Sequence, residues 1–211
     1  MPPQHRKAST THSVFTRPPP SAVTYDLSVP HQATITLPPG SAWTSGPHWH
    51  EMHTEFLRVV SGAAEIRLCG TLLPAVTAAD GTITVPRGEI HEWKRSSSTL
   101  QDEPLVVSEW TQPRDGVKEV FFRCVNGLLL ESDPGEARKR EPRGTSQGRW
   151  NDTWQRWILE LELMNVFWRM DNWPLLLPVG WPGIVQWIAT KAVLGVALVL
   201  GWCLGRKGVY K

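Results

Sequence analysis

The sequence predicts an all-β fold, a small antiparallel barrel or sandwich, which is followed by a helical and hydrophobic C-terminal extension. Residues 21–125 contain short runs rich in Val, Thr, Ile and aromatic residues, and turn sequences such as Pro38-Pro39-Gly40 separate these runs. Many short strands at such spacing are typical of barrels and sandwiches. Beyond residue 150 the apolar residues recur every three or four positions, which indicates a helix.

Glycine and proline mark the turns between the strands, as in Ser61-Gly62 and Asp80-Gly81. We expect the barrel to occupy residues 21–125. The predicted strands are 22–28, 32–37, 54–60, 63–69, 82–86, 90–95, 104–110 and 118–124.

The regions on either side of the barrel differ from it in composition. Residues 1–20 are rich in Pro, Ser, Thr and basic side chains, so we expect a disordered tail. Residues 126–150 are predicted to be a charged linker or an insertion, because charged residues there alternate with Pro, Gly and Ser. Residues 151–211 are predicted to form the extension.

The extension combines an amphipathic helix with a hydrophobic segment. The spacing of Trp154, Trp157 and Leu161 predicts a helix that starts near residue 151 and ends near residue 171. Residues 184–205 carry one charge, Lys191, and a helix of that length is roughly 33 Å long, enough to cross a bilayer. The segment therefore either crosses a membrane, docks on the barrel or mediates oligomerisation.

We expect residues 174–211 to associate with a membrane or a hydrophobic partner, which includes a second copy in a homo-oligomer. Catalysis is expected not to depend chemically on these residues. The basic residues Arg206, Lys207 and Lys211 that follow the hydrophobic segment favour a cytoplasmic C-terminus.

Composition excludes one class of partner and favours one compartment. With 22 Lys and Arg against 20 Asp and Glu, the net charge of +2 provides no cationic surplus for binding nucleic acid. The three cysteines are too few and too scattered for a disulfide framework, and the N-terminus has no apolar run of a secretory signal. We therefore expect an intracellular protein.

Three histidines and one glutamate are the candidate metal ligands. His48 and His50 lie two positions apart, so on a strand they point to the same face. Glu55 joins that face if the chain turns between residues 50 and 55, and the turn at Pro86-Arg87-Gly88 brings His91 inward. His53 is an alternative ligand or proton relay, although a histidine in a turn is more commonly solvated.

Three imidazoles and a carboxylate are typical ligands of a divalent transition metal. Fe(II) or Mn is favoured because of the carboxylate, and the same set also suits Zn, Ni or Cu. Four protein ligands leave two positions open on a six-coordinate ion, where a substrate or dioxygen can bind.

The spacing of these residues resembles the two sequence motifs of the cupin superfamily. The first is His48-x-His50-x4-Glu55-x6-Gly62, and the second is Pro86-x-Gly88-x2-His91. The resemblance implies a small antiparallel jelly-roll barrel with a metal ion inside it. The segments PHWHEMHTEF, VPRGEIHEW and SEWTQPRDGVKEVFFR are similar to fungal cupin-domain oxidoreductases of secondary-metabolite gene clusters, some of which make salicylaldehyde-type polyketides.

This resemblance implies a metal-dependent oxidoreductase or dioxygenase that modifies a small organic metabolite, such as a polyketide-derived aromatic compound. Two alternatives stay open. The same metal can act as a Lewis acid in an isomerase or cyclase, and the barrel can serve as a non-catalytic ligand-binding cupin that is tethered to a membrane.

Overall fold

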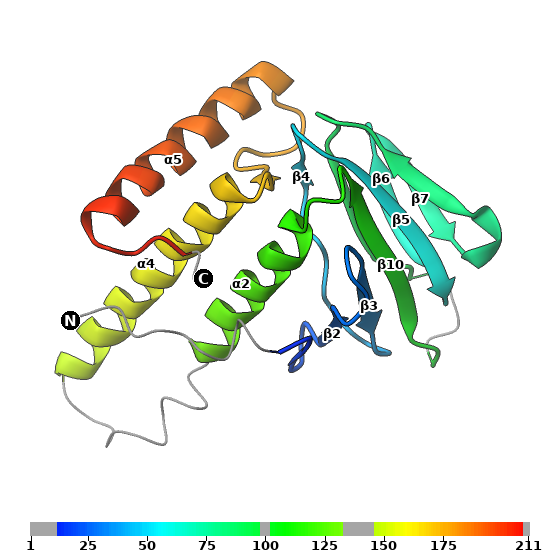
Figure 1. The fold of residues 1–211 in the computed structure, drawn as a ribbon, viewed down its shortest axis with the longest axis horizontal. Coiled ribbons are helices and arrows are strands. Elements are labelled where there is room, and N and C mark those ends of the chain that lie inside the picture. The colour runs from blue at the N-terminus through cyan, green and yellow to red at the C-terminus, as the bar shows by residue number, and fades with distance from the viewer. Residues whose placement is uncertain (1–11, 98–101, 133–145, 209–211) are drawn as a thin grey trace.

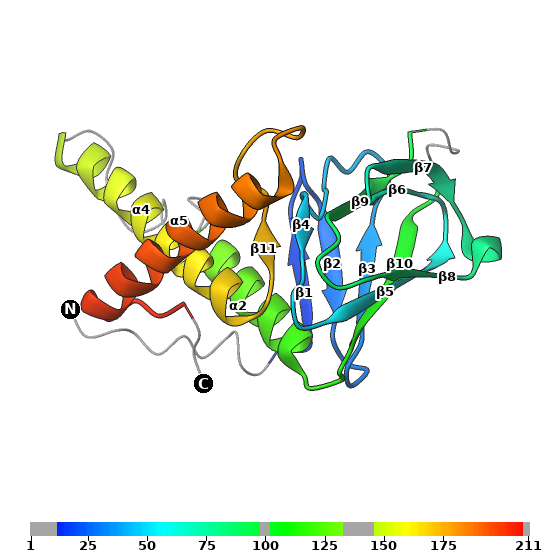
Figure 2. The same ribbon diagram turned by 90° about the horizontal axis from the view of Figure 1, so that it is seen from above.

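The computed structural model describes residues 12–97, 102–132 and 146–208, which form two facing β-sheets and a group of helices beside them. Figures 1 and 2 show the helices together on one side of the molecule, next to β4 and β11, and most of the strands on the other side.

All strand pairs in both sheets are antiparallel, and the one-turn helix η1 (Ala78–Asp80) lies between β7 and β8. The first sheet contains, in spatial order, β1 (Val14–Arg17), β2 (Val23–Asp26), β3 (Ala33–Leu37), β10 (Leu105–Gln112), β5 (Thr54–Ser61) and β8 (Thr82–Val85). The second contains β11 (Trp173–Pro174), β4 (His48–Trp49), β9 (His91–Arg95), β6 (Ala64–Leu68) and β7 (Thr71–Val76).

The hydrophobic core lies between the two sheets. Burial alternates along β3 from Ala33 to Leu37, as expected for a strand with one face in the core. Ile35 and Leu57 of the first sheet and Ile66 and Trp93 of the second are each at most 1% exposed. Full burial of a large aliphatic side chain contributes about 1.5–3 kcal/mol, so these contacts hold the two sheets together.

Three helices lie in the described part of the chain: α2 (Val117–Glu131), α4 (Ser146–Arg169) and α5 (Gly183–Cys203). Helix α4 packs against both α2 and α5, and Figure 1 shows it between them. The predicted antiparallel β-structure is present, as two facing sheets, but the chain as a whole is not all-β, because helices make up a large part of it.

The predicted strand 118–124 is wrong, since these residues belong to α2. Phe121, Phe122 and Leu128 of this helix are buried against the core of the sandwich. A short apolar run such as Val120-Phe121-Phe122 has the same composition in a buried strand and in a buried helix. The apolar spacing that continues to Leu128 is helical.

Other boundaries also differ from the prediction. Strand β1 lies within the predicted disordered tail 1–20, because Phe15 is anchored in the core, a tertiary contact that local composition does not reveal. No strand is predicted where β7 lies. Helices α2 and α4 extend into the predicted linker 126–150, and residues 1–11 and 133–145 lie outside the described residues.

The extension is joined to the sandwich through β11. Trp173 pairs with Trp49 of β4, and Pro174 pairs with His48. Trp49, Trp173 and Leu194 of α5 form a small hydrophobic cluster apart from the main core. Both residues of β4 are therefore buried: His48 faces the inside of the sandwich, and Trp49 faces the extension.

Candidate metal centre

His48, His50, Glu55 and His91 come together between the two sheets. His48 of β4 pairs with His91 of β9, His50 directly follows β4, and Glu55 lies on β5 of the opposite sheet. One potential ligand atom from each residue lies within 4.8 Å of all the others, and no residue of the four is more than 6% exposed. The structure thus assembles the four residues that the sequence predicts, and as a group they can hold a metal ion.

The turn at residues 86–88 brings the two motifs into contact. The backbone N–H of Gly88 donates a 2.7 Å hydrogen bond to the carbonyl of His50. Gly88 has a φ of +81°, a conformation that favours glycine. The turn therefore locks the start of β9, and with it His91, beside the end of β4.

Nδ1 of each of the three imidazoles contacts a backbone carbonyl. Nδ1 of His48 lies 2.8 Å from the carbonyl of Gly46, and Nδ1 of His91 lies 3.1 Å from that of Glu89. Nδ1 of His50 lies 2.5 Å from the carbonyl of Asp171. A carbonyl only accepts, so each Nδ1 carries the proton and each Nε2 is left with a free lone pair, as in metal-binding histidines.

The contacts on the inner side need a proton or a metal ion between the acceptor atoms. Oε2 of Glu55 lies 2.9 Å from Nε2 of His50 and 2.7 Å from Nε2 of His91. Because the single proton of a neutral ring is on Nδ1, these nitrogens and the carboxylate oxygen are all acceptors. They lie this close only if a shared proton or a metal ion is between them. A divalent transition metal fits this set of three nitrogens and one oxygen.

The protonation states of the buried groups agree with metal binding. Burial lowers the pKa of His48 well below its usual value, and repulsion from His91 and His50 lowers it further. Burial also lowers the pKa of His50, against the opposing effect of Glu55. Both imidazoles are therefore neutral near pH 7, the form that binds a metal ion.

Lys118 of α2 compensates the charge of Glu55. Its Nζ donates a 2.5 Å hydrogen bond to Oε1 of Glu55 and is also paired with Glu109 of β10. Burial raises the pKa of Glu55, but Lys118 outweighs this effect and holds the pKa well below its usual value. Burial and the charge of Glu55 raise the pKa of Glu109 well above its usual value. The buried group therefore holds an ionised Glu55, a charged Lys118 and a protonated Glu109.

Asp171, at the junction of α4 and β11, organises the turn that follows His50. Its carbonyl accepts from His50, and its carboxylate accepts hydrogen bonds from the backbone N–H groups of Glu51 and Met52 at 2.9 and 2.8 Å. Its φ of +51° is a left-handed conformation that Asp tolerates better than most residues. The extension therefore orients a candidate ligand from more than 100 residues away in the sequence.

His53 lies outside the ligand cluster. It is buried, whereas a histidine in a turn is more commonly solvated. It is 6% exposed, and its two ring nitrogens lie 2.7 Å from Asp171 and 3.0 Å from Asp115. Because both ring nitrogens face carboxylates, His53 links the turn to the extension through Asp171 and to the segment before α2 through Asp115.

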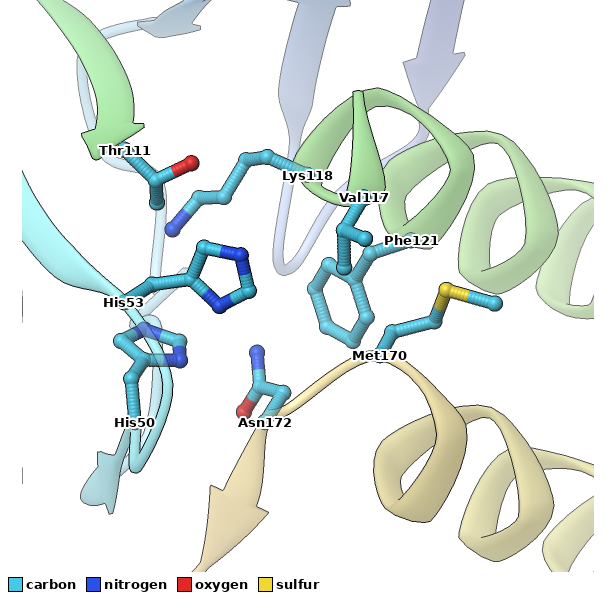
Figure 3. A pocket seen from close by; sticks show the side chains of 8 residues that line it. All are labelled: His50, His53, Thr111, Val117, Lys118, Phe121, Met170 and Asn172. Carbon is cyan, nitrogen blue, oxygen red and sulfur yellow. The ribbon is translucent and has the colours of Figure 1, made fainter. Parts of the chain in front are cut away.

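A small cavity of about 10 Å³ lies beside His50, roughly the space that one water molecule needs. Figure 3 shows its wall: Lys118 and Phe121 from α2, Thr111 from the end of β10, and Met170 and Asn172 from the segment after α4. Helices and their connections thus cover the candidate centre on this side.

Sequence reasoning did not identify Lys118, Glu109 or Asp171. The sequence does contain a signal for Glu109. It lies two and four positions after the buried residues Val107 and Leu105 on β10, so its side chain points to the same inner face. Lys118 was hidden by the wrong assignment of its segment to a strand. Asp171 has no local signal, since its contacts depend on how the extension packs.

No protein-family model and no curated protein matches the sequence. Among solved structures, a predicted oxalate decarboxylase from Thermotoga maritima is similar at 20% identity, over 43% of this chain and 79% of that one, with a TM-score of 0.36. KdgF from Halomonas sp. is similar at 21% identity over 49% and 89%, with a TM-score of 0.36. The capsular polysaccharide assembling protein CapF from Staphylococcus aureus is similar at 22% identity over 48% and 31%, with a TM-score of 0.36. These likenesses cover less than half of the chain and assign no activity to it.

Proposed function

We propose that the protein is a metal-dependent oxidoreductase or dioxygenase that acts on a small organic molecule, with polyketide-derived aromatic metabolites as the substrate class. One observation carries the proposal. Three neutral or carbonyl-oriented imidazoles converge with an ionised carboxylate in a buried space, and their acceptor atoms need a shared proton or a metal ion between them. The resemblance of both motifs to cupins supports the same conclusion, and the narrower resemblance to fungal oxidoreductases supports the substrate class.

His48, His50, Glu55 and His91 would hold the ion. When bound, Fe(II) or Mn(II) supplies the one-electron chemistry that a reaction with dioxygen needs. The chain itself keeps Glu55 ionised through Lys118 and holds the three imidazoles with Nε2 inward.

The cavity wall suggests how a substrate would be placed. The hydroxyl of Thr111, the ammonium of Lys118 and the amide of Asn172 offer polar contacts, while Phe121 and Met170 exclude water. The cavity of about 10 Å³ holds no organic molecule, so a substrate would reach it by displacing side chains of this wall.

Oxygen consumption tests the proposed reaction. The full chain is loaded with Fe(II) or Mn(II) and mixed with salicyl alcohol or salicylaldehyde as simple aromatic probes, under air and without oxygen. We expect conversion coupled to oxygen uptake in the native protein. His91→Ala, which removes a ligand, is expected to abolish it, and His12→Ala, an exposed histidine far from the site, is the matched control.

The other outcomes select the alternatives. Conversion that continues unchanged without oxygen or another electron acceptor indicates an isomerase or cyclase that uses the metal as a Lewis acid. Tight binding of a probe without any conversion indicates a ligand-binding protein. Either result overturns the oxidoreductase proposal and leaves the metal centre in place.

A further inference from the structure

The outward side of α5 and the segment before it carry most of the large hydrophobic residues that are exposed in the described part of the chain. Of the 20 large hydrophobic residues that are exposed there, 12 lie within residues 176–204. They are Leu176, Val179, Trp181, Ile184, Trp187, Ile188, Val193, Val196, Val199, Leu200, Trp202 and Leu204. Contiguous surfaces of this kind mark interaction sites.

The inward side of α5 is different, because its polar residues are buried and bound to the protein. The amide of Gln186 exchanges hydrogen bonds with the backbone of Leu177 at 3.0 and 3.1 Å, and the hydroxyl of Thr190 donates to the carbonyl of Pro174 at 3.0 Å. Lys191 pairs with Glu51 at 2.8 Å and lies over the ring of Trp173. The one charged residue of α5 therefore lies at the edge of its apolar side, beside Trp187, and its charge is paired with Glu51.

Helix α5 is also fitted closely to α4. The side-chain amide of Asn165 donates a 2.9 Å hydrogen bond to the carbonyl of Ala197. A Cβ atom at Gly201 would lie 2.5 Å from the same amide, so the approach of the two helices requires glycine there. Glycine thus brings α5 close to α4 within this chain.

These contacts decide between spanning a membrane and lying on one. Helix α5 passes the length and composition test for a span, yet 22% of its most apolar window is buried inside the protein. Spanning would strip Gln186, Thr190 and Lys191 of their partners and place them in lipid, where unsatisfied polar groups cost several kcal/mol each. Lying in the membrane surface keeps all these bonds and buries only the apolar side.

We propose that α5 is an in-plane anchor that docks the protein on the surface of a lipid bilayer with anionic headgroups. The exposed apolar residues within 176–204 are called the stripe below. Three tryptophans, Trp181, Trp187 and Trp202, are distributed along this stripe, and tryptophan favours the interface between water and lipid. The helix of 21 residues is roughly 30 Å long and carries no acidic side chain. The exposed Lys207 follows its end, next to Arg206, which is paired with Glu162, and a cation there complements anionic headgroups.

Vesicle flotation with the full-length protein tests the anchor, and it needs no knowledge of the substrate. The vesicles are phosphatidylcholine alone or mixed with phosphatidylglycerol. We expect the native protein to float with both and more strongly with the anionic mixture. Ile188→Glu combined with Val196→Glu places two charges on the stripe and is expected to weaken partitioning roughly tenfold or more.

The matched control is Val29→Glu combined with Leu72→Glu, two exposed apolar residues of the sandwich, which is expected to float like the native protein. Equal thermal unfolding temperatures show that both variants fold. Loss of flotation in both variants alike, or no flotation of the native protein, overturns the proposal. So does a lipid-free dimer that the α5 variant dissociates, because a second copy of the chain then covers the stripe.

Cysteine labelling distinguishes an in-plane helix from a spanning one. Lys207, just after α5, is exposed and is replaced by cysteine, the exposed Cys69 and Cys203 are replaced by serine, and the buried Cys124 stays. After the protein is added outside preformed vesicles, a membrane-impermeant maleimide should label the Lys207→Cys variant as fully as it does after detergent is added. Labelling that requires detergent shows that the end of α5 has crossed the bilayer, which contradicts the in-plane arrangement.

Discussion

The sandwich and the helical extension contribute to the candidate metal centre in different ways. The sandwich supplies all four candidate ligands, on β4, β5 and β9 and in the turn after β4. The segment after α4 supplies the carbonyl of Asp171 behind His50, and helix α2 supplies Lys118 behind Glu55. The carbonyls behind His48 and His91 come from the sandwich itself. The ligand atoms therefore come from the sandwich, whereas the orientation of His50 and the charge balance of Glu55 depend on the helical part.

The extension therefore contributes to the structure around the candidate centre. The sequence predicts that catalysis does not depend chemically on residues 174–211, a segment that begins three residues after Asp171. Pro174 pairs with His48 in the sheet, and α5 reaches Glu51 in the turn between His50 and Glu55. The segment carries none of the four ligands, but it packs around two of the elements that position them.

The largest expected effect comes from removing the buried charge that α2 provides. Lys118→Met leaves Glu55 and Glu109 buried together without a cation. Breaking a buried ion pair in this way costs about 3–5 kcal/mol, so the free energy of unfolding of the metal-free protein should fall by that amount. Urea denaturation measures it.

Lys94→Met is the matched control for Lys118. Lys94 pairs with Glu65 on the surface, where an ion pair contributes about 0–1 kcal/mol. Equal losses in the two variants would contradict the role of α2 as the source of a needed charge.

The next effect concerns the turn between His50 and Glu55, which the side chain of Asp171 holds. Asp171→Ala keeps the carbonyl behind His50 but removes the carboxylate that accepts from Glu51 and Met52, and loss of such a supporting contact weakens metal binding roughly 10–100-fold. Asp171→Asn keeps an acceptor and tolerates the left-handed backbone, so it should retain most of the affinity. Titration with a divalent metal, followed by calorimetry, compares the two.

Asp102→Ala, at an exposed aspartate far from the site, should bind metal like the native protein. If Asp171→Ala also binds like the native protein, the carboxylate of Asp171 does not support the centre through the turn, and the comparison between the two regions loses this contact.

The smallest effect concerns the contact between α5 and the turn. Glu51 and Lys191 form a half-buried ion pair, which contributes about 1 kcal/mol or less. Glu51→Gln should therefore increase hydrogen exchange along α5 slightly and leave the exchange of β5 unchanged. Faster exchange in β5 as well would mean that the extension and the sandwich unfold as one unit.

The same division explains how much of the molecule could be predicted from the sequence. His48, His50, Glu55 and His91 were predictable because a strand period of two and a turn at Gly88 place them by local rules. The strands of the sandwich were mostly predictable for the same reason. The helix α2 was missed because the short apolar run at residues 120–122 also fits a strand, although the apolar spacing from Val117 to Leu128 is helical.

Asp171 and Lys118 could not be recognised as parts of the site for a physical reason. Each acts on a residue that is 63 or more positions away in the sequence, and its role exists only after the helices have packed on the sandwich. The candidate ligands are close in the sequence or in paired strands, whereas these supporting contacts depend on tertiary packing.

Metal content tests the central claim most directly. Native mass spectrometry with elemental analysis counts the ions in the full-length protein, in His50→Ala and His91→Ala, and in the control His12→Ala. The structure predicts one divalent transition-metal ion per chain in the native protein and the control, and loss of that ion in both ligand variants. Full occupancy in both ligand variants, or a native protein that binds no metal when it is offered one, would contradict the assignment of the centre.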